Sequence, residues 1–202
     1  MKFVKIIIVL TMVVFGFVCI SKLYATDKQS YPIKIDEVLS NKEDLNPAYS
    51  VREDVALNGN QTVFIITDDN ENEVLSISSA EINGNQLLNV GFMPFHSENP
   101  VKLEDCEEIL MFVSKLSGLF KSDRSLYDTF INECGVKNTE FAEYEINNRS
   151  PLPQRKQDII WKGKVDGIYC SIKLSEPAND DAWFLSTITL ATDKSFVYTD
   201  NK

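Results

Sequence analysis

The stretch LEDCEEILMFVSKLSGLFK, residues 103–121, has the clearest helical period in the chain. Its apolar side chains recur at steps of three and four residues from Cys106 to Phe120, which places them on one side of a helix. Acidic residues crowd the first two turns, and Lys115 and Lys121 lie toward the end, which is the charge order that a helix dipole favours. The stretch predicts an amphipathic helix over Leu103–Lys121 with a broad buried face. It contains no catalytic or ligand-binding motif, so it indicates the fold and not the function.

A second helix is predicted directly after the first. Ser122-Asp123 can cap its start, a wide apolar face runs from Leu126 to Cys134, and Gly135 is suited to end it. Because the link is so short, we expect the two helices to form an antiparallel hairpin.

Strands are predicted on both sides of this helix pair, from apolar runs separated by turn residues such as Asn83-Gly84-Asn85. Turns this short indicate an antiparallel meander. Residues 139–147 fit a strand or a helical turn. The predicted fold class is therefore α+β, with an antiparallel sheet of about six strands and the helix hairpin on one face. The predicted strands are Thr62–Thr67, Glu73–Ile82, Gln86–Phe92, Ile159–Lys164, Gly167–Leu174 and Ala182–Ala191. The last of them is apolar on both sides, which predicts a central strand.

The N-terminus has the pattern of a targeting segment. Lys2 and Lys5 precede an apolar run over residues 6–20, and Ala25 suits a cleavage site, so residues 1–25 are predicted to be a signal peptide. The expected location is the periplasm or the exterior. Two alternatives stay open: residues 6–20 as an uncleaved membrane anchor, or a lipid attached at Cys19.

The rest of the chain is predicted to be one domain. Residues 26–50 are expected to be a mobile segment with one short helix or edge strand around residues 33–39, because they are polar and contain Pro32 and Pro47. Residues 51–202 are expected to form a single α+β domain, since no repeat, low-complexity tract or long linker divides them.

The chain is acidic, with a formal net charge of −10. Residues 1–25 hold three lysines and no acidic residue, so a chain cut after Ala25 would carry −13. Such a charge argues against nucleic acids and anionic membranes as partners and favours a basic protein. The charge also promotes solubility by itself, and this alternative stays open.

Three cysteines remain after removal of residues 1–25, and an oxidising compartment favours pairing of two of them. We predict a disulfide between Cys106 and Cys134, because an antiparallel helix hairpin would bring their ends together. A disulfide between Cys134 and Cys170 would close a loop of similar length. The loop-closure entropy therefore does not distinguish the Cys106–Cys134 pair from the Cys134–Cys170 pair. Cys170, between Ile168 and Ile172 on one strand face, is expected to be a buried free thiol.

No catalytic, cofactor-binding or metal-binding residue is predicted. His96 is the one histidine, and its neighbours Ser97 and Glu98 do not make a triad, because triads are assembled from separate segments. The sequence has no Gly-x-Ser-x-Gly motif and no glycine-rich phosphate loop. The acidic stretch from Asp68 also fails the calcium-loop pattern, which requires glycine at its sixth position, where this chain has Glu73.

Four aromatic residues lie on predicted strands: Trp161, Tyr169, Trp183 and Phe184. We interpret them as core residues and not as a platform for carbohydrate.

These features predict a binding protein and not an enzyme. The expected function is that of an exported inhibitor or immunity-type protein, which neutralises a basic partner such as a toxin enzyme by occlusion; this rests on an analogy of class and not on a motif. A periplasmic carrier of an apolar ligand or lipid is the alternative, and a small hydrolase is a third possibility. The candidate partner-binding residues are the acidic residues of two loops, Asp68, Asp69, Glu71, Glu73, Asp180 and Asp181.

Overall fold

The computed structural model describes residues 31–42, 45–54, 60–92, 101–134, 144–147, 155–177 and 182–198. Its strands are β1 (Ser50–Glu53), β2 (Gln61–Thr67), β3 (Glu73–Ile82), β4 (Asn85–Phe92), β5 (Tyr144–Asn147), β6 (Arg155–Val165), β7 (Ile168–Pro177) and β8 (Phe184–Ala191). Its helices are α2 (Ile35–Lys42), α3 (Glu107–Ser117) and α4 (Ser125–Cys134), with short 3-10 helices η1 (Leu103–Asp105) and η2 (Lys194–Phe196).

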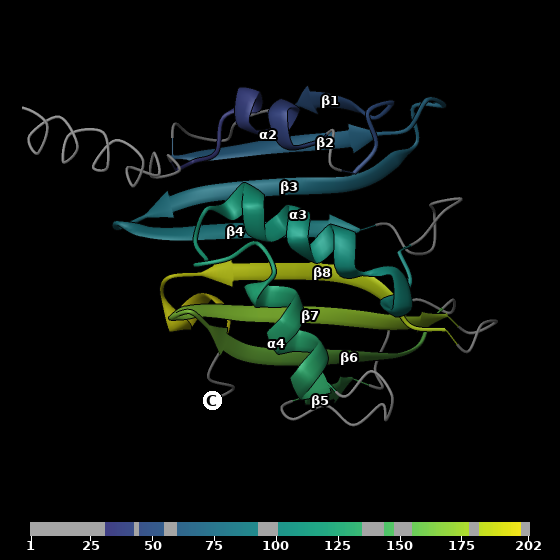
Figure 1. Cartoon of the computed structure of the whole chain (residues 1–202), viewed down its shortest axis with the longest axis vertical. Helices are drawn as coiled ribbons and strands as arrows, with labels where there is room; N and C mark the ends of the chain where they lie inside the picture. Colours follow the sequence, from purple (N-terminus) through teal and green to yellow (C-terminus); the bar gives the residue numbers. More distant parts are fainter. Residues whose placement is uncertain are drawn as a thin grey trace, which may run out of the picture.

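Within these residues, eight strands form one antiparallel sheet, and the three α-helices lie on one of its faces (Figure 1). The predicted α+β class is confirmed. The sheet has two strands more than expected, and these are its short edge strands β1 and β5. β5 occupies part of the segment for which a strand and a helical turn were both open.

The sheet consists of two four-stranded meanders, β1–β4 and β5–β8, each in chain order. The two meanders meet at β4 and β8, so the last strand of each lies in the middle of the sheet. The turns Asn83-Gly84 and Asp166-Gly167 have positive φ at both residues, which matches the right-handed twist of the strands that they join. β8 lies between β4 and β7, which confirms the predicted central strand.

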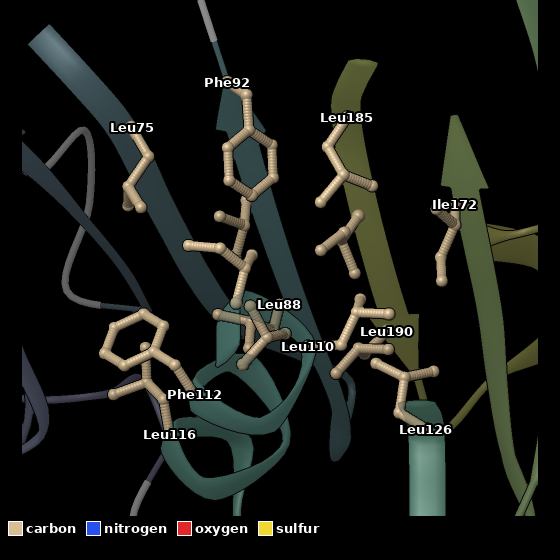
Figure 2. Close-up of a cluster of buried hydrophobic side chains, with 14 of the residues drawn as sticks. Leu75, Leu88, Phe92, Leu110, Phe112, Leu116, Leu126, Ile172, Leu185 and Leu190 are labelled. Atoms are coloured by element: carbon tan, nitrogen blue, oxygen red, sulfur yellow. The ribbon is translucent and has the colours of Figure 1, made fainter. Parts of the chain in front are cut away.

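The core fills the space between the sheet and the helices. Figure 2 shows side chains of this core, among them Leu75, Leu88 and Leu190 from the sheet and Leu110 and Leu116 from α3. All five side chains are fully buried. Burial of a leucine side chain stabilises the fold by about 1.5–3 kcal/mol, so this layer is the main source of stability.

The first helix is shorter than the sequence predicted. Its α-helical part is Glu107–Ser117, and residues 103–105 form the 3-10 helix η1 instead of a first α-helical turn. Gly118 ends α3 with φ of 60°, and its N–H donates to the carbonyls of Ser114 and Lys115. The apolar pattern continues through Leu119 and Phe120, but glycine favours this left-handed C-terminal position, and the local backbone preference prevails.

Part of the segment that we expected to be mobile packs on the domain. Ile33 and Val38 are fully buried, and α2 confirms the short helix among the two predicted options. The Ile33 N–H donates to Ser79 Oγ at 2.8 Å, and the Tyr31 hydroxyl donates to the Ser117 carbonyl at 3.0 Å. The predicted signal peptide, residues 1–25, lies outside the described residues. Among the helices that are described, none is both long and apolar enough to span a membrane.

The predicted disulfide is not formed in the structure, because Cys106 is a buried free thiol. Cys106 directly follows η1, which is held at the start of β8 by a bridge between Lys102 and Phe184. The end of α4 lies over β6, where Glu133 accepts a hydrogen bond of 3.0 Å from Trp161 Nε1. The side chain of Cys134 itself lies outside the described part.

The sheet register gives the physical reason. Trp161 of β6 pairs with Ile172 of β7, which pairs with Ile188 of β8. Trp161 therefore lies two strand spacings, about 10 Å, from β8. Ile188 is four residues, about 13 Å, from Phe184 along that strand. The end of α4 is thus much farther from Cys106 than the roughly 4.4–6.8 Å that bonded Cα atoms allow. The two helices cover different strands (Figure 1).

Candidate functional site

The turn between β2 and β3 holds three of the six acidic residues that we singled out, Asp68, Asp69 and Glu71, and a fourth, Glu73, is the first residue of β3. Asp68 has a structural role in it: its carboxylate accepts hydrogen bonds from the backbone N–H groups of Asn70 and Asn72 at 2.9 and 2.8 Å. It also accepts one from the Asn72 side-chain amide at 3.1 Å, and these hydrogen bonds lower the pKa of Asp68, the side-chain amide contributing most. The side chains of Asp69 and Glu71 are exposed to solvent.

A second acidic segment lies at η1 and the start of α3. Glu104 and Asp105 are exposed, and a bridge between Lys102 and Phe184 holds this segment against the start of β8. Lys102 lies 3.9 Å from Glu104, but both side chains are largely exposed, so the ion pair contributes little.

The fold brings these two segments to the same end of the sheet. β3 and β8 are both antiparallel to β4, so they run in the same direction and begin at the same end. Two strand spacings, about 10 Å, separate them. We call the exposed carboxylates of Asp69, Glu71, Glu104 and Asp105 the acidic end.

The other two candidate residues, Asp180 and Asp181, lie outside the described residues, as does His96. The two strands that flank Asp180 and Asp181 in the sequence are described: β7 ends at Pro177 and β8 begins at Phe184, both at the acidic end. Glu104 and Asp105 were not predicted as partner-binding residues. No local signal could have found them, because their position depends on the contact between η1 and β8.

One carboxylate near the acidic end is neutralised within the protein. The side chain of Asp158 is 3% exposed, and its Oδ2 lies 2.9 Å from Lys173 Nζ. Ser175 Oγ donates to Asp158 Oδ1 at 2.6 Å. A buried carboxylate requires such partners, so Asp158 belongs to the framework and not to the charged surface.

The two described thiols are poor nucleophiles. Cys106 and Cys170 are buried, and Cys170 is free, as predicted. Burial raises the pKa of each thiol to about 12, because the thiolate would lose its hydration. Both thiols are therefore protonated at neutral pH, which argues against nucleophilic catalysis by either.

A surface hollow of about 300 Å³ lies on α3. Its lining residues are Glu108, Met111, Phe112, Lys115 and Asp123. Three of these five are charged, whereas a pocket for an apolar ligand is lined mainly by apolar groups, so the hollow does not favour the carrier alternative. In the described part of the chain, no three side chains of the His, Cys, Asp or Glu type are grouped so that they could hold a metal ion.

No protein-family model matches the chain, and neither the comparison with curated proteins nor that with solved structures finds a match.

Proposed function

We propose that this chain is an exported protein-binding module that docks a basic protein partner at its acidic end, in the manner of an inhibitor or immunity protein that occludes a toxin enzyme. The observation that carries the proposal is the convergence of exposed carboxylates from two separate segments, the β2–β3 turn and η1. The formal net charge of −10 adds a long-range field of the same sign.

The arrangement fits recognition of a basic surface for two reasons. Asp69 and Glu71 lie on a turn that Asp68 makes rigid through its own hydrogen bonds, so little side-chain and loop ordering is required on binding. Opposite charge also steers encounter, which raises the association rate more than it raises affinity.

The test compares two triple variants with the same change in charge. Asp69→Asn/Glu71→Gln/Glu104→Gln removes three exposed charges from the acidic end. Asp36→Asn/Glu53→Gln/Glu81→Gln removes three exposed charges from α2 and from the opposite ends of β1 and β3. Each protein is immobilised and exposed to native extract at low salt, and the stoichiometry and association rate of the captured protein are measured.

The proposal is supported if the wild type and the control variant capture a basic protein stoichiometrically and the acidic-end variant does not. It is also supported if the acidic-end variant captures that protein with an association rate lowered by about tenfold. The association rate should also fall as salt rises. Equal capture by both variants places the contact elsewhere and contradicts it. Absence of any stoichiometric partner at low salt contradicts the function as a whole.

A further inference from the structure

The face of the sheet opposite the helices has a composition unlike the rest of the surface. No helix of the described residues covers it, and the C-terminal segment that contains η2 lies over one end of it (Figure 1). We call it the open face. Its central residues are small and polar, and they are Ser76, Ser78, Gly91, Asn89, Thr187, Thr189 and Ser171.

Three lysines lie on the part of the open face that β6, β7 and β8 build. Among the described side chains of β6, β7 and β8, this face carries Lys162, Lys164 and Lys173, and the single carboxylate Asp158. Asp158 is already bound to Lys173 at 2.9 Å. The chain has 30 acidic and 20 basic residues, so a surplus of cations in one place is a departure from its overall charge.

Three lysines gather around two tyrosine rings at the end of this part of the open face. Tyr169 of β7 and Tyr198 of the C-terminal segment make an edge-to-face contact with centroids 6.2 Å apart. Lys162 and Lys194 place Nζ 5.8 and 5.3 Å from the Tyr198 centroid. Lys164 Nζ lies 4.6 Å from the Tyr169 centroid and donates to its hydroxyl at 3.4 Å. We call these five residues the lysine–tyrosine cluster.

The cluster gathers like charges that an anion would stabilise. Neither Lys164 nor Lys194 makes an ion pair with any residue in the part of the chain that is described. Asp193 is adjacent to Lys194, but its Oδ1 accepts from Ser195 N and Oγ, both at 2.8 Å. Cation–π contacts of exposed lysines are weak, so they hold the ammonium groups of Lys164 and Lys194 without neutralising their charge.

A row of hydrogen-bonding side chains leads away from the cluster. Lys162 pairs with Ser171, Ser171 with Thr189, Thr189 with Asn89, and Asn89 with Ser78, so one polar group per strand faces outward. Thr189 Oγ1 donates to Asn89 Oδ1 at 2.9 Å, which orients the amide. The groups are about 4.8 Å apart, and together they span four strands.

We propose that the open face binds an extended carboxylated glycan. Its carboxylate contacts the ammonium groups of the lysine–tyrosine cluster, and its sugar hydroxyls exchange hydrogen bonds with the row from Ser171 to Ser78. Tyr169, which the sequence suggested as a core residue, is half-buried and faces outward here. This surface is separate from the acidic end, so its function does not depend on the proposed basic partner.

The charge distribution favours a single anionic strand over a broad polyanion. A membrane surface or a nucleic acid presents closely spaced charges over a wide area, and it would also meet the acidic remainder of the chain. A single glycan strand carries its carboxylates in one line, so one of them can lie at the cluster while the sugar hydroxyls lie along the row. Its attraction to the lysines is local, since charges beyond about 8–10 Å are screened at physiological salt.

The test uses calorimetric titration of the whole protein with an oligogalacturonate. A neutral cello-oligosaccharide of equal length, inorganic phosphate, and vesicles that contain phosphatidylglycerol are the comparison ligands. Lys164→Gln/Lys194→Gln removes two cations of the cluster, and Lys34→Gln/Lys102→Gln removes two exposed cations away from it. Thr189→Val/Ser171→Ala removes hydroxyls of the row without changing charge. Thermal unfolding of each variant confirms that it is folded.

We expect the oligogalacturonate to bind, the cluster variant to weaken binding by at least about tenfold, and the control to change it by less than about twofold. The row variant should weaken it by about three- to tenfold. Equal binding of the neutral sugar, or equal affinity of the cluster variant, overturns the proposal. Three other results also overturn the proposal. Phosphate that binds as tightly as the sugar assigns the cluster to a free anion, and binding of the vesicles assigns it to lipid. Absence of oligogalacturonate binding excludes this class of glycan.

Discussion

The two faces of the one sheet differ in composition, although the same strands build both. On β3, Leu75 and Ile77 point to the helices and are fully buried, whereas Ser76 and Ser78, which alternate with them, are half-buried. Stability comes from the first set, because burial of apolar area is the main favourable term in folding. The second set buries no large apolar side chain and contributes less to stability.

The largest expected difference between the faces is at adjacent residues of β6. Trp161→Ala should destabilise the protein by about 3–5 kcal/mol, because it empties a fully buried site and removes the edge-to-face contact with Phe130. Lys162→Ala, one residue later on the open face, should change stability by about 0.5 kcal/mol or less. Urea unfolding monitored by circular dichroism measures both. Similar losses for the two variants would show that the open face is covered.

The second prediction concerns the exception on the open face, the buried carboxylate of Asp158. Asp158→Ala should cost about 2–3 kcal/mol, less than a fully buried pair, because the Lys173 side chain that it leaves uncompensated is 26% exposed. The double variant Asp158→Ala/Lys173→Met should recover part of this loss. A double-mutant cycle by urea unfolding measures the coupling. A coupling near zero would mean that the pair is solvated and does not act as framework.

Two glycines extend the comparison to the backbone. A Cβ at Gly163 would collide with the ring of Trp161 on the covered face, so Gly163→Ala should cost about 1–3 kcal/mol. A Cβ at Gly91 on the open face would come 2.9 Å from Ser76 Oγ, a hydroxyl that can rotate away. Gly91→Ala should therefore change stability by about 0.5 kcal/mol or less. Denaturant midpoints of the two variants provide the measurement, and an equal loss would refute the distinction.

The smallest expected effect concerns the link that holds the helices on the covered face. Asp166 in the β6–β7 turn accepts a hydrogen bond of 2.9 Å from the Lys121 backbone N–H, and this bond is the main cause that lowers the pKa of Asp166 below its ordinary value of 3.8. A lowered pKa stabilises the folded state above pH 3.8, and this stabilisation is lost as the pH falls through the folded-state pKa.

Asp166→Asn should thus lower the melting temperature slightly at pH 5–7 and have no effect near pH 2, which thermal unfolding across this pH range measures. Glu81→Gln is the control for removal of one exposed acidic charge. A difference between wild type and Asp166→Asn that grows toward low pH would contradict the assigned role.

The sequence predicted the local features of the fold well because their causes are local. Alternation with period two identified β3 over Glu73–Ile82 with its observed bounds, and Asn83-Gly84 indicated the turn that follows. The bounds of α3 were less accurate, because the apolar period extends past Gly118 while the backbone preference of glycine does not. The short edge strands β1 and β5 were missed or left open, since four residues give too little pattern.

The candidate site was predicted only in part. The sequence marked Asp69 and Glu71 as an exposed acidic turn, because charge and turn propensity are properties of consecutive residues. Their proximity to Glu104 and Asp105 was not predictable, since it depends on β8 taking its place beside β4. The Cys106–Cys134 disulfide was predicted from an expected antiparallel hairpin, and the structure instead places α4 over β6.

The sequence by itself determined which residues of each strand are apolar, where the tight turns lie, and that the chain is acidic. Tertiary structure alone decided that the two meanders join through β4 and β8 and that Tyr198 packs on Tyr169. The physical reason is that turn geometry and side-chain alternation act over a few residues. The choice of neighbouring strand depends on the total apolar area that one arrangement buries relative to all others, and no short stretch of sequence contains that sum.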